Sequence, residues 1–507
     1  MGAKSIYSLL ALHLNLLFLL AKAERVVDPS KTLVWGPGLH LGRTRLPAEY
    51  FFIHAVDSNG NRFTEPPPLS FVVSFEGLAS VGKCRRLLDV IDRGDGSYIV
   101  RYKVLEICSN VILAIKYNGT HVAKSPYNSE ATLYSERCNC PTLDPDNFMT
   151  TYNCPPEESY GQILKDLVPF DQVNFTAVRD GVLKKYDMPG SISLCQYVVK
   201  DNKVYRKCHG NYTGFKMFMD ATLLALTRLV TLPDLEFFLN LGDWPLSKKK
   251  RGAQMIEPDP IISWCGSRDT YDIVLPTYDH TESSLENMGR VSLDMLSVQK
   301  MNYAWDEKEN KGFWRGRDSR RERLKMVDIA RKYPQLFNAS ITNFFFFRDE
   351  EEKYGPRVPH ISFLEFFKYK YQINIDGTIA AYRFPYLLGG NSVVFKQNSP
   401  FYEFFYSTLV PYKHYIPIKR DLSDLVDKIL WAKKNDGIVR DIANEARQYV
   451  NQNLLPHHVI CYHVQLFREW SKRIVSPIEV LPDMERLPQK YDCSCSDNSL
   501  PLEKDEL

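Results

Sequence analysis

An acidic residue that directly follows an apolar run is the first feature of this sequence that could do chemistry. Asp243 comes just after the apolar segment 237–241. In open α/β sheets ligands bind at the carboxyl ends of strands, so a carboxylate at such a position can serve as a general base. An aspartate in this context can equally be a turn or cap residue, and the local pattern leaves both interpretations open.

Arginines form the second candidate group. The segment 315–323 carries five of them and leads into a helix pattern. Planar guanidinium groups near a helix N-terminus suit a diphosphate, although a solvated helix with intrahelical ion pairs would contain the same residues. Arg383 differs, because it lies in an apolar and aromatic stretch where a buried arginine needs an anionic partner.

These residues must be positioned by the region from 158 to 500, in which helix patterns alternate with short apolar strands. The alternation predicts parallel sheets and an α/β architecture, and the length suits two facing sheets better than one. The predicted helices are 220–232 and 320–332, and the predicted strands are 237–241, 273–275, 341–347 and 371–375.

A different pattern precedes this region. Residues 34–133 contain short alternating apolar runs separated by turn residues, which is typical of an antiparallel sandwich of roughly a hundred residues. The segments 92–102 and 117–127 resemble the turn and closing-strand signatures of filamin-type immunoglobulin repeats. We therefore expect residues 24–136 to form an immunoglobulin-like domain, and its lack of a catalytic constellation favours a structural or partner-binding role.

The cysteines indicate an oxidising compartment. The chain has 11, an odd number that leaves at least one thiol outside intramolecular disulfides, and the two C-x-C pairs at 138–140 and 493–495 are expected to bond elsewhere rather than internally. Residues 137–157 form a cysteine-rich linker between the two main regions. Four N-x-S/T sequons predict glycans on surface loops, at Asn118, Asn174, Asn211 and Asn338.

The two ends of the chain carry targeting signals. Residues 1–23 have the layout of a cleaved signal peptide, with an apolar run too short for a membrane anchor, and 504–507 read KDEL. Together they predict a protein of the endoplasmic reticulum lumen that the KDEL receptor retrieves. No later stretch is apolar enough to span a bilayer, and the near balance of 64 basic and 61 acidic residues gives no reason to expect nucleic acid as a partner.

Several ordered motifs resemble a known family, the Rumi-type protein O-glucosyltransferases. With a filamin-type repeat in front and KDEL behind, the chain is similar to the KDEL-motif-containing branch of that family. The resemblance covers roughly 158–480. It is carried by the segments from Leu232-Pro233-Asp234 to Asp243-Trp244-Pro245, Arg315-Gly316, 368–371, Tyr382-Arg383-Phe384, 414–417 and 421–423.

The resemblance implies a B-type glycosyltransferase with two Rossmann-like subdomains over 158–500. It also implies transfer of glucose from UDP-glucose to serine hydroxyls of EGF-like repeats, with inversion at the anomeric carbon. Asp243 matches the catalytic base, and Arg323 and Arg383 match the arginines that hold the diphosphate. Arg315 matches an arginine of the same loop, whereas 317–321 departs from the usual small and polar residues.

A single displacement of this kind needs one carboxylate to take the serine proton and fixed cations to stabilise the departing UDP, so no metal cofactor is expected. A metal-dependent alternative would use an Asp-x-Asp motif. The clearest one, Asp144-Pro145-Asp146, lies in the cysteine-rich linker and not at a strand end, so we interpret these aspartates as loop residues rather than metal ligands.

Two other functions fit parts of the sequence. A non-enzymatic lumenal chaperone or lectin would explain KDEL and the disulfides but would leave Asp243 and Arg383 without a task. A degenerate pseudoenzyme is the other option, and the retained base argues against it. If Asp243 is not the base, Asp272 and Asp376 are the next acids to test.

Overall fold

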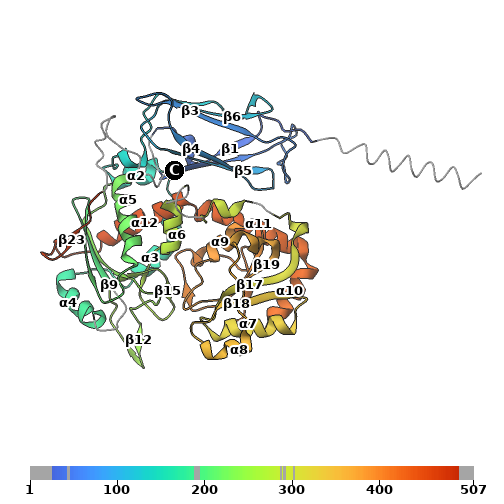
Figure 1. Cartoon of the computed structure of the whole chain (residues 1–507). Coiled ribbons are helices and arrows are strands. Elements are labelled where there is room, and N and C mark those ends of the chain that lie inside the picture. The colour runs from blue at the N-terminus through green and yellow to red at the C-terminus, as the bar shows by residue number, and fades with distance from the viewer. Residues whose placement is uncertain are drawn as a thin grey trace, which may run out of the picture.

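A β-sandwich lies across two α/β halves in this structure, a computed structural model (Figure 1). The structure describes residues 25–42, 46–187, 194–285, 288, 293–300 and 303–489. The predicted signal peptide, the KDEL tetrapeptide and the pair Cys493 and Cys495 lie outside the described residues. Among the helices that are described, none is long and apolar enough to cross a membrane.

The sandwich has the two-sheet architecture that the alternating pattern predicted. One sheet has the strand order β1(Leu33–Trp35)-β2(Glu49–His54)-β5(Ser97–Val104)-β4(Arg86–Asp92). The other contains β3(Val72–Leu78), β6(Ser109–Tyr117), β7(Thr120–His121) and β8(Tyr127–Ser129). Phe51, Phe75 and Leu113 are fully buried between the sheets, and the Cys84–Cys108 disulfide closes one end.

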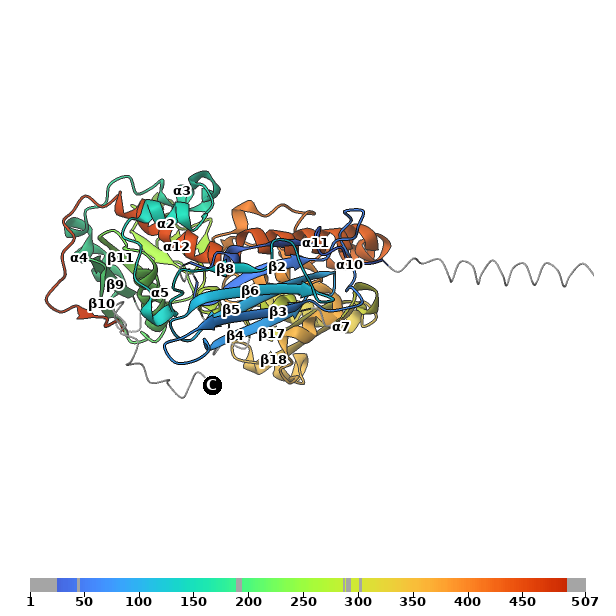
Figure 2. The same ribbon diagram turned by 90° about the horizontal axis from the view of Figure 1, so that it is seen from above.

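The outer face of the β1-β2-β5-β4 sheet is not solvated, because it packs on the α/β region. Tyr50, Phe52 and Ile99 on this face belong to the same hydrophobic cluster as the core of the first α/β half. Arg101 bonds the carboxylate of Asp294 at 2.7 Å, and a second ion pair is described below. Seen from above, the sandwich lies over the junction of the halves (Figure 2). The sandwich is therefore an integral layer of the molecule.

The first α/β half contains a mixed sheet, which differs from the predicted parallel one. Its order is β16(Ile273–Val274)-β14(Ile261–Ser263)-β11(Leu235–Asn240)-β9(Leu194–Lys200)-β10(Lys203–His209)-β23(Glu485–Arg486), and only β11, β14 and β16 are parallel. Strands β9 and β10 form a hairpin because Asp201 and Asn202 both adopt positive φ, as a two-residue hairpin turn requires. The Cys195–Cys208 disulfide joins its two strands.

The second half is a five-stranded parallel sheet, as predicted. Its order is β18(Phe337–Asn343)-β17(Glu309–Arg317)-β19(Tyr369–Asn374)-β20(Val393–Gln397)-β22(Ile416–Ile418), with α7(Arg321–Lys332) connecting β17 to β18. Strand β18 ends at Asn343, four residues before the predicted end. The reason is the buried carboxylate of Asp318, which accepts the backbone N–H groups of 345, 346 and 347 and turns the phenylalanine run away from the sheet.

Two helices near the C-terminus tie the halves together. Helix α11(Asp436–Asn453) packs on the second half, and α12(Pro456–Ser471) returns to β11 of the first half. Arg447 of α11 also bonds Asp95 of the sandwich at 2.6 Å, which is the second ion pair of that interface. A disulfide between Cys154 and Cys461 anchors the linker to α12.

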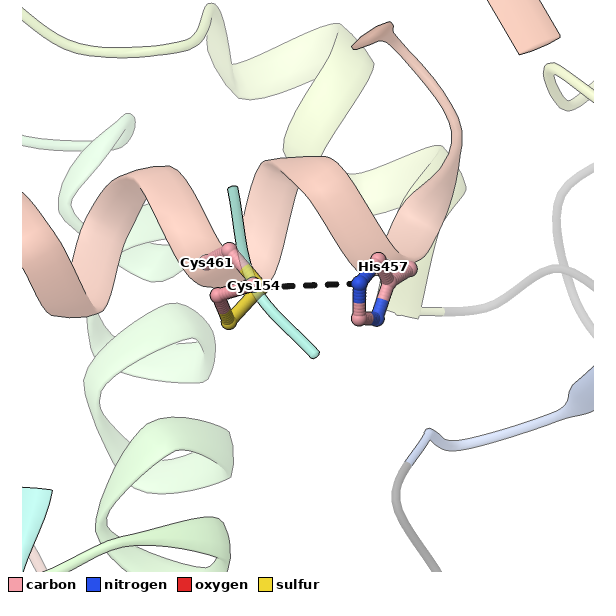
Figure 3. A group of neighbouring side chains, drawn as sticks. All are labelled: Cys154, His457 and Cys461. Atoms are coloured by element: carbon pink, nitrogen blue, oxygen red, sulfur yellow. Dashed lines mark hydrogen bonds between the residues drawn. A yellow bond between two sulfur atoms is a disulfide. The ribbon is translucent and has the colours of Figure 1, made fainter. Parts of the chain in front are cut away.

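His457 lies one helical turn before Cys461 and points at this disulfide (Figure 3). Its Nε2 is 3.8 Å from the sulfur of Cys461. Three potential metal ligands thus lie close together, but the two sulfur atoms are bonded to each other and cannot act as thiolates. This group is a structural crosslink in the described chain.

The structure also shows the state of two further cysteines and the positions of the four predicted glycan sites. Cys138 is disulfide-bonded, whereas Cys265 is a buried thiol. Asn118 and Asn211 lie in exposed turns, and Asn174 is exposed at the N-cap of α4(Phe175–Tyr186). The prediction of a surface loop is wrong for Asn338, which lies within β18 and donates its side-chain amide to the hydroxyl of Tyr369 at 2.7 Å.

Candidate active site

Asp243 lies at the carboxyl end of β11, in a turn that Asn240 organises. The side-chain amide of Asn240 donates to the carbonyl oxygen of Trp244 at 2.7 Å and accepts the N–H of Gly242 at 2.8 Å. The Asp243 carboxylate is half-buried and makes no hydrogen bond with any described residue. Burial raises its pKa, and the Arg317 guanidinium partly opposes that rise. A carboxylate with this environment can accept a proton from a bound hydroxyl.

The segment from β17 to α7 supplies the cations of the site. Arg323, on the first turn of α7, is 5% exposed and donates to the carbonyl oxygens of Arg317, Ile375 and Asp376 at 2.9, 3.2 and 2.7 Å. Burial lowers its pKa, with a further contribution from the neighbouring guanidinium of Arg383. The carbonyl bonds fix the position of Arg323 without neutralising it, so the cation retains its charge for an anionic group.

Arg383 and Arg323 converge on Gly316. A Cβ placed on Gly316 would lie 3.1 Å from Nη2 of Arg383 and 3.3 Å from Nη1 of Arg323. Arg383 also donates to the carbonyl oxygen of Arg315 at 2.5 Å. A side chain at position 316 would crowd both guanidinium groups, so the position favours glycine. Arg323 and Arg383 together present two positive charges at this point of the pocket.

Arg315 faces the same pocket but is directed largely toward Asn338. Its guanidinium donates to the side-chain oxygen of Asn338 at 2.7 Å and lies over the ring of Phe313. This contact explains why the Asn338 amide is engaged inside the fold. Of the three arginines predicted for the site, Arg315 is therefore the one whose guanidinium is least available to bind an anion.

All four predicted residues line one pocket of about 400 Å³ between the two halves. In the second half the pocket lies where the neighbouring strands β17 and β19 end. The next strand after β17 in the chain, β18, lies on the other side of β17, so the order of the strands reverses at this point. Such switch points are where open α/β sheets bind nucleotides. Its volume is in the range of small-molecule sites. The lining residues are Asp243, Tyr278, Arg315, Gly316, Arg317, Ser319, Arg323, Thr342, His360, Ile361, Phe366, Gly377, Thr378, Ile379, Ala380, Ala381, Tyr382 and Arg383.

The other acids considered from sequence have structural contacts elsewhere. Asp272 is buried, and its carboxylate accepts two backbone N–H groups and the Ser263 hydroxyl. Asp376 accepts the hydroxyl of Ser399. Asp144 caps α2(Pro145–Thr151) and Asp146 pairs with Arg468. None of these four lines the pocket that contains Asp243.

Sequence reasoning missed several residues of the pocket. Arg317 faces Asp243 closely enough to lower its pKa, and Tyr278 and Tyr382 form part of the wall. Arg317 belongs to the arginine-rich segment, which was a usable signal. Tyr278 lies on α6(Tyr278–Leu285), far from any motif. The folding of the first half brings it to the site, where its ring packs edge to face on Trp264 and on Tyr382 of the second half.

The pocket of this α/β fold holds a carboxylate from the first half and several guanidinium groups from the second, an arrangement that suits group transfer from an anionic donor. Comparison with known proteins agrees. The chain matches the family described as "Glycosyl transferase family 90" over residues 149–504 and the "Filamin/ABP280 repeat" over residues 26–128.

Curated relatives give the same result. "Protein O-glucosyltransferase 2" of Danio rerio is 47% identical over 94% of both chains. "Protein O-glucosyltransferase 3" of Homo sapiens is 44% identical over 96% of both chains. "Protein O-glucosyltransferase 1" of Homo sapiens is 27% identical and covers 62% of this chain and 79% of its own. This chain belongs to the Rumi-type protein O-glucosyltransferase family, within glycosyltransferase family 90, and carries a filamin repeat before its transferase domain.

Proposed function

We propose that this protein transfers glucose from UDP-glucose to serine hydroxyls of EGF-like repeats in the endoplasmic reticulum lumen, with inversion at the anomeric carbon. The observation that carries the proposal is the placement of Asp243, from the first half, across one pocket from Arg317, Arg323 and Arg383, from the second. A nucleotide diphosphate at the switch point would meet the arginines, and its sugar would extend toward the carboxylate.

The reaction is then a single displacement. The serine oxygen forms a bond to the anomeric carbon while the bond from that carbon to the diphosphate oxygen breaks, and Asp243 takes the serine proton. The electron pair of the broken bond leaves on UDP, where the guanidinium groups of Arg323 and Arg383 stabilise the added charge. Attack from the side opposite the leaving group inverts the anomeric carbon.

Arginines in this arrangement would do the work that a divalent cation does in metal-dependent transferases, so we propose a metal-independent reaction. Activity should persist in the presence of a chelator. Loss of activity with a chelator and its recovery with manganese would contradict this part of the proposal.

A lumenal location fits the disulfides and the terminal KDEL, which the KDEL receptor would read. The names of the relatives, which are protein O-glucosyltransferases, support a protein acceptor. EGF-like repeats, themselves disulfide-bonded, would be fully folded in that compartment.

The decisive experiment is mass spectrometry of a folded EGF-like repeat incubated with the purified protein and a panel of UDP-sugars. We expect a hexose on one serine with UDP-glucose. Incorporation of pentose alone from UDP-xylose would replace the proposed donor. No transfer from any sugar to any serine-containing repeat would refute the proposed activity.

A further inference from the structure

A second cavity, of about 690 Å³, adjoins the active-site pocket and has no role in the displacement described above. It lies between the two halves, beside the short sheet in which β15(Gly266–Ser267) pairs with β21(Phe401–Tyr402). The charged residues that line it are nearly all basic, and Asp424 is the one acidic residue among them. The basic residues are Lys165, Lys249, Arg268, Lys396, Lys419 and Lys428.

None of these six cations forms an ion pair with a described residue. Lys249 donates to the carbonyl oxygen of Arg268 at 2.9 Å, and Lys428 bonds the hydroxyl of Tyr412. Asp424, the one carboxylate, accepts the backbone N–H of Lys419. Cations gathered at one cavity repel one another, so the arrangement becomes favourable when an anion binds among them.

Lys396 lines the cavity, and its side chain is surrounded by aromatic rings. Its ammonium group lies 4.4 Å from the centre of the Tyr406 ring, and the rings of Phe384 and Tyr415 are also nearby. Its only hydrogen bond to a described residue is a long one of 3.4 Å, to the carbonyl oxygen of Gln397. Burial lowers the pKa of Lys396, and the nearby carboxylates of Asp376 and Glu403 oppose that decrease without forming an ion pair with it. The ammonium group can therefore still pair with an anion that enters the cavity.

The wall between the cavity and the active-site pocket is thin. Trp244, adjacent in sequence to Asp243, is 45% exposed and packs edge to face on Phe401 of the cavity, with ring centres 5.8 Å apart. The guanidinium of Arg320 lies over both rings and donates to the carbonyl oxygen of Thr378, which lines the active-site pocket. The cavity thus lies within reach of a polypeptide whose serine is bound at Asp243, with Trp244 and Phe401 between the two sites.

We propose that this cationic cavity is the docking subsite for an acidic segment of the acceptor protein. The inference rests on the proposed function, because it assigns the cavity to the acceptor. The donor has its own guanidinium groups at the switch point, and the volume of the second cavity accommodates several side chains. Aspartate or glutamate carboxylates would pair with the lysines, while the aromatic rings around Lys396 would contact their methylene groups.

The test compares two variants with the same change in net charge. K165Q/R268Q/K419Q removes three exposed cations of the cavity whose side chains make no hydrogen bond to a described residue. K248Q/K434Q/R486Q removes three exposed cations that lie outside the cavity. The first readout is the binding of a fluorescent glutamate-rich peptide to the full-length proteins at several salt concentrations. The second is the KM for a folded acidic acceptor, and the third is the Kd of UDP.

We expect each removed cation to weaken peptide binding by about two- to fivefold, so the cavity variant should bind the peptide about ten- to a hundredfold more weakly. It should also show a smaller salt dependence. Its KM for the acceptor should rise similarly, while its Kd for UDP and all values for the control variant stay unchanged. Equal peptide binding by both variants would overturn the proposal. Displacement of the peptide by UDP, or by inorganic phosphate at matched concentration, would also overturn it, because the cavity would then be a nucleotide or small-anion site.

The peptide measurement does not depend on catalysis. If the cavity variant alone loses peptide binding but no protein accepts glucose, the proposed glucosyltransferase function fails while the acidic-segment site stands. If glucose is transferred and the two variants behave alike in every readout, the proposed function stands and the docking subsite is rejected.

Discussion

At the residue scale, Asp243 combines the features of a general base, since it is half-buried, lacks a hydrogen bond to any described residue and lies across the pocket from a cluster of guanidinium groups. Most other buried acids of this half are satisfied by hydrogen bonds, as Asp272 is. A carboxylate without partners is costly to maintain in a structural role. This contrast favours the functional interpretation over that of a turn aspartate.

Replacing Asp243 and replacing Arg383 should have different effects on transfer and on UDP binding. Asp243→Asn keeps the shape of the side chain and removes its basicity, so we expect glucosyl transfer to fall by about a hundred- to ten-thousand-fold with little change in UDP affinity. Arg383→Ala should weaken UDP binding as well as turnover, because it removes a charge-assisted contact. Transfer kinetics and UDP calorimetry on both variants test this. An Asp243→Asn variant with nearly parental turnover would return Asp243 to a structural role.

The pH dependence of transfer should report the environment of Asp243. Burial raises the pKa of this carboxyl, and a base works only when deprotonated, so kcat/KM should fall as pH decreases through a value above the usual aspartate pKa of about 3.9. Arg317 lowers that pKa, so Arg317→Gln should move the acidic limb to higher pH. An acidic limb that does not move in this variant would mean that another group controls the profile.

At the element scale, helix α3(Gly161–Leu167) is held against β16 by a buried acid. The carboxyl of Asp166 accepts the side-chain amide of Gln162 at 2.7 Å and the N–H of Val274 at 3.0 Å. Burial raises its pKa to about 7. The folded protein thus holds a proton there that the unfolded chain releases near pH 4, so this site favours folding most at low pH, and the benefit is lost as pH rises toward 7.

Asp166→Asn should therefore stabilise the protein selectively above pH 7, by about 2–4 kcal/mol, and have little effect near pH 4. An asparagine can still accept from Val274 and bond Gln162 after the latter rotates. Thermal unfolding of parent and variant across this pH range is the measurement, with Asp171→Asn, at an exposed site, as the control. A stability difference that does not change with pH would contradict the assigned pKa.

At the scale of the whole molecule, the sandwich and the transferase domain share buried surface. Leu46, Tyr50, Phe52, Ile91 and Ile99 of the sandwich are all buried in the cluster that continues into the first α/β half. The filamin repeat therefore contributes to the stability of the transferase domain, in addition to any role in binding partners.

Deleting residues 24–136 should expose an apolar surface on the transferase domain and lower its midpoint of thermal unfolding, because each buried side chain of this size contributes about 1.5–3 kcal/mol. Binding of a hydrophobic dye should increase in the truncated protein. Calorimetry of the full-length protein should show one joint transition for the two regions. Two independent transitions, with an unchanged midpoint after the deletion, would show that the sandwich is merely tethered.

The sequence by itself determined the local features of this protein. Alternation of period two predicted the sandwich, and strand–helix alternation predicted the second, parallel sheet, because both patterns arise from which side of each element is buried. Asp243, Arg315, Arg323 and Arg383 were found from residue type and motif, and the structure brings them to one pocket. What chemistry they perform there stays a prediction.

Only the tertiary structure decided relations between segments distant in sequence. The hairpin of β9 and β10 made the first sheet mixed, and the carboxylate of Asp318 ended β18 early. Pairing with β17 placed Asn338 within β18, where Arg315 bonds its side chain. The burial of one sandwich face, the wall formed by Tyr278 and the second cavity also depend on packing between elements. Local periodicity carries no information on these contacts, because they depend on long-range packing that a residue's own neighbours do not specify.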